Sequence, residues 1–234
     1  MPKVTGVRVN YYDFDMKKDM TNGSFPKTLF PGATFQMMVD NDVVYNNTVD
    51  WSVSTNAGDN TVTVNQDGVV SFSKDIDENC IGKTFVIFAT DKVTDKYISA
   101  YVIKPLRFFK PHVETWDGFC SAWKWVVDEK GTFPARRDIN NVPYDELEIE
   151  SYHDIKREVN SGLFQEWGFL LFSGWTNPLH GAIGNHEIRF KFFQEENNEI
   201  YISEVRSHNS RDLWDDSMDL YAQAVAFYGQ SIVS

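Results

Sequence analysis

Short runs of alternating apolar and polar residues fill the first half of the chain, and turn residues separate these runs. Alternation with a period of two is typical of β-strands that bury one face. At Asp67-Gly68, the glycine provides the positive φ that a tight hairpin turn requires. The pattern predicts strands at residues 4–10, 34–39, 49–54, 61–64, 69–73, 84–90 and 96–103.

Seven strands in about 100 residues is the number expected of an immunoglobulin-like sandwich of two sheets. Trp51 lies in the third predicted strand and is the natural central core residue. We therefore predict an all-β first domain in which Trp51 has a structural role and no ligand.

The spacing of apolar residues changes after residue 107. Apolar residues recur at helical intervals from Phe119 to Val127, and Lys130-Gly131 is typical of a helix end with a C-cap glycine. Helices followed by strands indicate an α+β domain. The remaining pattern predicts a loop at residues 133–143, a polar helix at 144–159 and strands at 168–175, 187–193, 199–205 and 221–228.

Lys104-Pro105 and Lys110-Pro111 bracket the point at which the composition changes. Neither proline can continue a central strand, so we expect a short hinge there. Residues 1–107 carry 11 basic and 13 acidic side chains, whereas the rest of the chain carries 11 and 21, together with six of the seven Trp residues. We predict two domains, residues 1–107 and 108–234, of which the second is acidic and aromatic.

The net charge of −12 and the apolar content of 42% restrict the function. The apolar content is ample for a folded core, and an acidic surface repels phosphate, so we expect no nucleic-acid partner. No run approaches the roughly 18 apolar residues that a membrane helix needs, and no signal peptide opens the chain.

The two cysteines, Cys80 and Cys120, lie one in each predicted domain. A disulfide between them would join the domains, and two buried free thiols are the alternative. Spacing alone leaves both possibilities open.

Three segments of the first domain resemble the bacterial immunoglobulin-like repeat in the same order. They are WSVS at residues 51–54, VTVNQDGVV at 62–70 and GKTFVI at 82–87. The resemblance implies a module that spaces and presents another domain, without catalysis.

The strongest signal in the second half is SGLFQEWG at residues 161–168, followed by FSGW at 172–175. These segments resemble a box in the C-type-lectin-like domains of the intimin/invasin family of enterobacterial adhesins. Phe133-Pro134-Ala135 stands where that fold has its Leu-Pro element, and Trp116, Cys120 and Trp123 are similar to its first helix.

The resemblance implies a bacterial surface adhesin tip: an immunoglobulin-like sandwich followed by an α+β C-type-lectin-like domain. It also implies a host-protein partner, a monomeric fragment, no cofactor and a longer parent of the inverse-autotransporter class, anchored in the outer membrane by a separate β-barrel. Family members often pair a first-helix cysteine with one in the last strand. Residues 226–229 (AFYG) contain none, which favours a free Cys120.

Metal and catalytic sites are disfavoured by their incomplete patterns. His186-Glu187 starts a zinc-protease box, but Phe190 stands where the second histidine would be, and His180 lies in a Gly/Asn-rich loop. The carboxylates of residues 212–219 lack the second motif of a lectin calcium site. Glu195 and Glu196 are adjacent in sequence and cannot flank one glycosidic bond from a strand. We predict neither metal nor catalysis.

Exposed aromatic and arginine side chains dominate the binding energy at many protein interfaces. Trp116, Trp123, Trp167 and Phe169 are predicted to be core residues. The predicted partner contacts are Arg136, Arg137, Trp175, Tyr201, Arg206, Arg211, Trp214 and Tyr228. The rival hypotheses are a protein that binds or hydrolyses glycans, with an immunoglobulin-like accessory domain, and a structural β-protein such as a phage-tail component.

Overall fold

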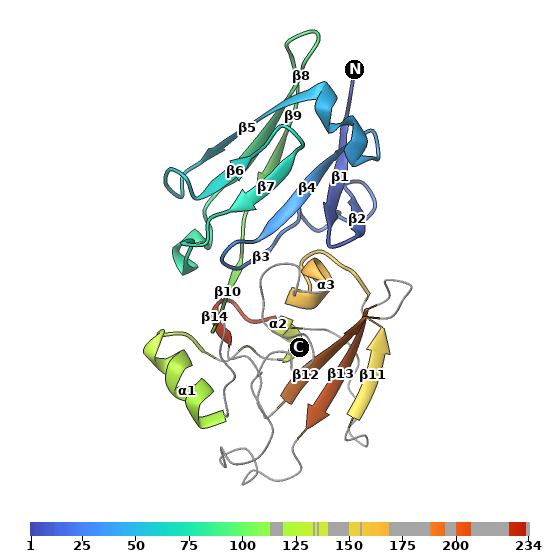
Figure 1. The fold of residues 1–234 in the computed structure, drawn as a ribbon. Helices are drawn as coiled ribbons and strands as arrows, with labels where there is room; N and C mark the ends of the chain where they lie inside the picture. Colours follow the sequence, from blue (N-terminus) through green and yellow to red (C-terminus); the bar gives the residue numbers. More distant parts are fainter. Residues whose placement is uncertain are drawn as a thin grey trace. The chain divides into compact units, whose positions relative to one another are not determined.

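The computed structural model describes residues 1–112, 119–132, 134, 136–139, 150–154, 156–168, 188–194, 200–206 and 225–232 (Figure 1). The chain forms two compact units. Unit 1 consists of Met1–Phe108 with Glu158–Asn160, and unit 2 of Phe109–Arg157 with Ser161–Ser234.

Unit 1 contains two antiparallel sheets (Figure 1). The five-stranded sheet has the order β2-β1-β4-β7-β6, and the three-stranded sheet has the order β5-β8-β9. The strands of the first sheet are β1 (Val4–Val9), β2 (Tyr12–Asp15), β4 (Thr34–Val39), β6 (Val62–Val64) and β7 (Val69–Phe72). Those of the second are β5 (Val49–Thr55), β8 (Phe85–Asp91) and β9 (Lys96–Ile103).

Buried aromatic side chains contribute to the core of unit 1, among them Phe35, Phe72 and Phe85. Phe72 of β7 meets Phe85 of β8 edge to face, with ring centroids 5.2 Å apart. Phe25 meets Phe35 in the same way at 5.3 Å. This packing is that of a β-sandwich, as the alternating pattern predicts.

Trp51 is a core residue, as predicted, with 6% of its surface exposed. Its indole N–H donates to the backbone carbonyl of Asn46 at 3.2 Å, so its one polar atom is satisfied. Asn46 lies in the 3-10 helix η1 (Val43–Thr48) and donates through Nδ2 to the carbonyls of Met37 and Asp67, both at 2.7 Å.

The turn at Asp67-Gly68 is confirmed, and Gly68 has a φ of 72°. A Cβ on Gly68 would lie 2.8 Å from Nδ2 of Asn46. Glycine is therefore required here both for its backbone conformation and for the close approach of the Asn46 amide.

Three strands were missed in the sequence interpretation. The strands β2 and β3 (Thr28–Leu29) were not predicted. The third is β10 (Arg107–Pro111), which lies in the segment predicted as a hinge and pairs in parallel with β3 at Arg107 and Phe108. Pro111 is the last residue of β10, a position at which a strand tolerates proline.

The described residues of unit 2 form three helices and the three-stranded antiparallel sheet β11-β13-β12, while β14 is hydrogen-bonded to β10. The helices are α1 (Phe119–Asp128), α2 (Arg136–Ile139) and α3 (Leu163–Trp167). The strands are β11 (Glu150–Asp154), β12 (Ile188–Gln194), β13 (Ile200–Arg206) and β14 (Val225–Gly229).

Four predicted elements of unit 2 are confirmed: the helix from Phe119 and the strands that correspond to β12, β13 and β14. The predicted polar helix at residues 144–159 is wrong, because β11 lies within this segment and pairs along its whole length with β13. The predicted loop at 133–143 contains α2. Of the predicted strand 168–175, only Gly168 is described, and it ends α3.

Candidate binding surface

Helix α1 is held to the rest of unit 2 through its C-terminal end. Lys130 has a φ of 58°, and the N–H of Gly131 donates to the carbonyl of Val126 at 3.0 Å. This is a Schellman cap in which Lys130, and not the predicted Gly131, adopts the left-handed conformation. Gly131 instead allows β14 to approach, since a Cβ there would lie 2.8 Å from the Cβ of Ala226.

Side chains from β10, from β14 and from His112, which follows β10, contact the C-terminal part of α1. The hydroxyl of Tyr228 donates to the carbonyl of Glu129 at 2.8 Å, and the ammonium group of Lys110 lies 2.5 Å from the Glu129 carboxylate. The ring of His112 stacks on Trp125 at 4.5 Å between centroids. Tyr228, predicted as a partner contact, is thus half-buried and uses its hydroxyl inside the unit.

The helix α2 begins with Arg136 and Arg137, two of the predicted contact residues, whose backbone alone is described. Its position is fixed by Asp138, which is fully buried. The Asp138 carboxylate accepts hydrogen bonds from the backbone N–H of Ile232, at 2.7 Å, and from the hydroxyl of Ser231. The chain beyond β14 therefore anchors the helix that carries the two arginines.

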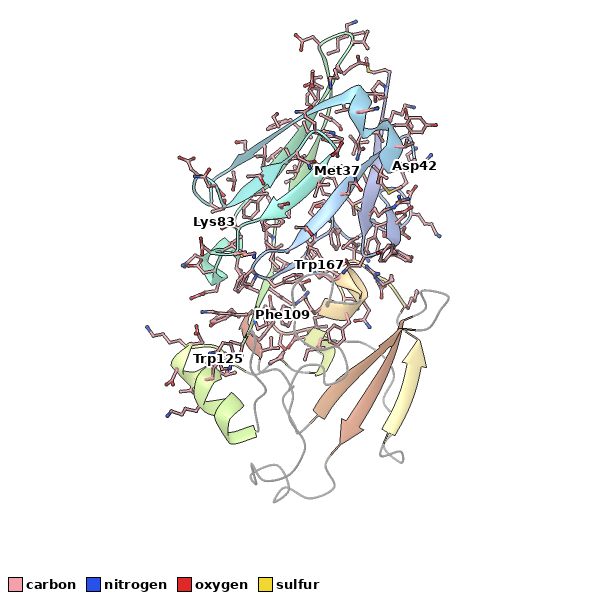
Figure 2. All side chains as sticks on the ribbon, in the orientation of Figure 1. Met37, Asp42, Lys83, Phe109, Trp125 and Trp167 are labelled. Atoms are coloured by element: carbon pink, nitrogen blue, oxygen red, sulfur yellow. The ribbon has the colours of Figure 1, made fainter. Side chains whose placement is uncertain are left out.

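The box at residues 161–168 is a core element, since every one of its residues is buried. Trp167, labelled in Figure 2 at α3, is fully buried, as predicted. Gly168 has a φ of 69°, and its N–H donates to the carbonyl of Phe164 at 2.8 Å, which closes α3. The guanidinium group of Arg157 donates to the carbonyls of Gln165 (3.1 Å) and Glu166 (2.9 Å), groups that a helix end leaves unpaired.

Tyr201 and Arg206 lie at opposite ends of β13. Tyr201 is paired with Asp154 and Phe193, whereas Arg206 is paired with Ile188. A separation of five residues in a strand is roughly 17 Å, so the structure does not bring these two predicted contacts together.

Several predicted residues lie outside the described residues. They are the contact residues Trp175, Arg211 and Trp214, the core residues Trp116 and Phe169, and the positions weighed for metal or catalysis, namely His180, His186, Glu195, Glu196 and residues 212–219. The backbone of Trp123 and Cys120 lies in α1, and nothing is described of their side chains.

Cys80 is a buried free thiol in the 3-10 helix η2 (Glu78–Cys80). Burial, followed by the nearby carboxylate of Asp77, raises the pKa of the Cys80 thiol to about 12. Since the Cys80 thiol is free, it forms no bridge to Cys120 in this structure, and the free state of Cys120 remains a prediction.

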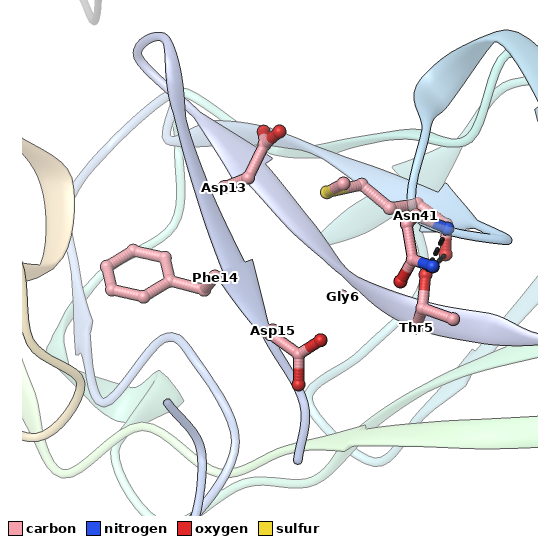
Figure 3. A pocket seen from close by; sticks show the side chains of 7 residues that line it. Thr5, Gly6, Asp13, Phe14, Asp15 and Asn41 are labelled. Carbon is pink, nitrogen blue, oxygen red and sulfur yellow. Dashed lines mark hydrogen bonds between the residues drawn. The ribbon is translucent and has the colours of Figure 1, made fainter. Parts of the chain in front are cut away.

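A small groove in unit 1 was not anticipated from the sequence (Figure 3). It is lined by residues of the β1–β2 hairpin together with Met38 and Asn41. Its polar atoms already serve the fold, because the Thr5 hydroxyl accepts from the N–H of Asn41 at 2.8 Å and Asp15 Oδ1 accepts from the N–H groups of Lys17 and Lys18. The groove gives no evidence of a ligand site.

Within the described parts of the chain, no group of three or more His, Cys, Asp or Glu side chains is placed to hold a metal ion. Among the described helices, none is both long and apolar enough to cross a membrane.

Comparison with known proteins decides the family. Residues 5–102 match the sequence family described as "Invasin, domain 4". The chain is also 30% identical, over 172 residues and 73% of its length, to a protein named Invasin from Yersinia enterocolitica. The chain belongs to the intimin/invasin family of adhesins.

The structural match agrees with this assignment. The crystal structure of invasin, described as a bacterial integrin-binding protein, covers 98% of this chain with a TM-score of 0.63 and 21% identity. Unit 1 is thus an immunoglobulin-like all-β domain that resembles invasin, and membership of this adhesin family favours a binding protein over an enzyme. The chain spans 18% of the curated relative and 40% of the solved chain.

Proposed function

We propose that this chain is the receptor-binding segment of a bacterial surface adhesin and that unit 2 contacts a host protein. The observation that carries the proposal is the likeness over almost the whole chain to a protein described as integrin-binding. A host-cell integrin is therefore the first partner to test.

The proposed domains are those expected from the sequence: residues 1–107 as the presenting module, and 108–234 as a C-type-lectin-like domain that binds. The box at 161–168 supports the second assignment. All of its residues are buried, and a resemblance between buried residues is a resemblance of the core and so of the fold. The proposed contacts are the eight aromatic and arginine residues predicted from the sequence. Of these, Tyr228 is the weakest member, since its hydroxyl serves the fold.

The proposed mechanism is passive binding, with no cofactor and no covalent step. The acidic unit presents a few aromatic and guanidinium groups, and such groups are typical interface anchors. The proposed location is the bacterial cell surface.

The test uses the full chain immobilised on beads, with a purified integrin ectodomain and, separately, mammalian epithelial cells in suspension. Trp214→Ala and Arg211→Ala are expected to weaken binding by about 2 kcal/mol or more each, or roughly 30-fold, and to leave thermal stability almost unchanged. Tyr97→Ala and Lys92→Ala, at exposed positions of unit 1, serve as matched controls.

Two results would contradict the proposal. Equal binding by the variants and the wild-type chain would exclude the proposed surface, and no binding of the wild-type chain to cells would exclude the function. Binding that disappears when the ectodomain is enzymatically deglycosylated would instead support the glycan-binding alternative.

A further inference from the structure

One asparagine of unit 1 stands directly before a glycine. The pair is Asn22-Gly23, and it is the only Asn-Gly pair in the sequence. It lies between β2 and β3, in a turn that the N–H of Gly23 closes by donating to the carbonyl of Met20 at 3.2 Å. Asn22 is exposed, so water has access to this residue.

Gly23 has a backbone nitrogen that no side chain of its own covers. Its φ is 121°, a conformation that residues with a side chain rarely adopt. Asn47 and Asn60 are also exposed, but each of them is followed by a threonine. The branched Cβ of threonine hinders the approach of a neighbouring group to its backbone nitrogen, whereas glycine presents no such obstacle. Asn22 therefore differs from these two in the residue that follows it.

The ammonium group of Lys27 lies beside the same glycine. A Cβ on Gly23 would be 2.9 Å from Nζ of Lys27, which places the positive charge within roughly 5.5 Å of the Gly23 nitrogen. A cation at this distance stabilises the negative charge that develops on a nitrogen as its proton leaves. The Gly23 nitrogen is thus sterically open and has a stabilising charge near it.

We propose that Asn22 is a site of self-deamidation, in which the backbone nitrogen of Gly23 is the nucleophile and Lys27 assists through its charge. The nitrogen attacks Cγ of Asn22, and the Cγ–Nδ2 bond breaks as the new N–Cγ bond forms. Ammonia leaves with the proton of the Gly23 N–H, and the product is a five-membered succinimide ring. The step is intramolecular, because the reacting groups belong to adjacent residues.

Water then opens the ring. Cleavage of the N–Cγ bond gives an aspartate, and cleavage at the backbone carbonyl gives an isoaspartate, in which the main chain runs through the former side chain. Either product replaces a neutral amide by a carboxylate, with no oxidation or reduction. The hydrogen bond from Gly23 to Met20 must open before the nitrogen attacks, so the folded chain should react more slowly than the denatured chain.

The experiment incubates the wild-type full chain in mildly alkaline buffer of low ionic strength and follows it by peptide mass spectrometry. The peptide that contains Asn22 is expected to show the mass shift from an amide to a carboxyl group, and the intact chain should bind more tightly to an anion exchanger. Asn47 and Asn60 are internal controls and should remain amides. Deamidation of Asn22 that is no faster than that of these two would overturn the proposal.

The variant Lys27→Met tests the assistance by charge. At this distance an ammonium group changes the rate roughly threefold even in water, so the folded variant should deamidate about three times more slowly. Lys27→Arg keeps the charge and should keep the rate, and in denaturant all three chains should react equally fast. Equal rates for the folded wild-type chain and Lys27→Met would overturn the role of Lys27.

Discussion

Gly131 at the end of α1 and Ala226 in β14 are so close that a Cβ on Gly131 would lie 2.8 Å from the Cβ of Ala226. The same Cβ would lie 3.2 Å from Cζ of Tyr228. The helix cap itself does not need this glycine, because Lys130 provides the left-handed residue. Gly131 is therefore a packing residue that allows the helix and the strand to meet.

The first prediction concerns this contact. Gly131→Ala should destabilise the chain by about 1–3 kcal/mol, because an added methyl group overpacks a closely packed junction. Urea denaturation followed by tryptophan fluorescence measures the change. Ala226→Gly in the same chain should recover part of the loss, and simple additivity of the two changes would argue against the contact.

The second prediction concerns Asn46, which is 1% exposed and donates to two backbone carbonyls. Asn46→Ala removes both hydrogen bonds and leaves buried acceptors unpaired, so a loss of about 2–4 kcal/mol is expected. Asn47→Ala, at the exposed neighbouring position, should change the stability by less than about 0.5 kcal/mol. Similar losses for the two variants would contradict this role of Asn46.

The third prediction concerns the thiols. Because its pKa is about 12, Cys80 should not react with a thiol reagent in the folded chain near pH 8, since the thiolate is the reactive form. In denaturant, the wild-type chain should release two equivalents of free thiol, and a Cys120→Ser variant should release one that comes from Cys80. A wild-type chain without free thiols in denaturant would contradict the free Cys80.

The fourth prediction concerns Asp91, at the start of the β8–β9 turn. The backbone N–H of Thr94, at 2.8 Å, is the main reason that the pKa of Asp91 lies below its usual value, and the N–H of Val93 adds to it. Since the folded pKa is lowered, Asp91 stabilises the fold above the unfolded pKa of about 3.9, and this stabilisation is lost as the pH falls through the folded pKa. Asp91→Asn should therefore lose less stability than the wild-type chain between about pH 5 and about pH 2. Parallel denaturation midpoints across this range would contradict the prediction.

Local pattern predicted the strands that carry a strong apolar alternation and missed those that depend on distant partners. The segment 150–154 (ESYHD) lacks an apolar stripe, and its strand forms through pairing with β13, about 50 residues later in the chain. The hairpin of β1 and β2 was missed because Asn10-Tyr11 is not an expected turn sequence. The strand β10 was not predicted, because Pro111 is its last residue, a position where the missing N–H costs little.

The candidate contacts were predictable as residue types but not as a surface. The sequence placed Tyr201 and Arg206 in one group, whereas their positions along β13 separate them. It also treated Tyr228 as exposed, although its hydroxyl has a carbonyl partner in Glu129. Such contacts depend on which helices and strands pack together, and the spacing of residues along the chain does not show this.

The box at residues 161–168 is buried along its whole length. A substitution within this box is therefore expected to change the packing of the interior before it changes any surface contact. A genome search that uses this box would therefore collect proteins by their architecture and would say nothing of what each of them binds.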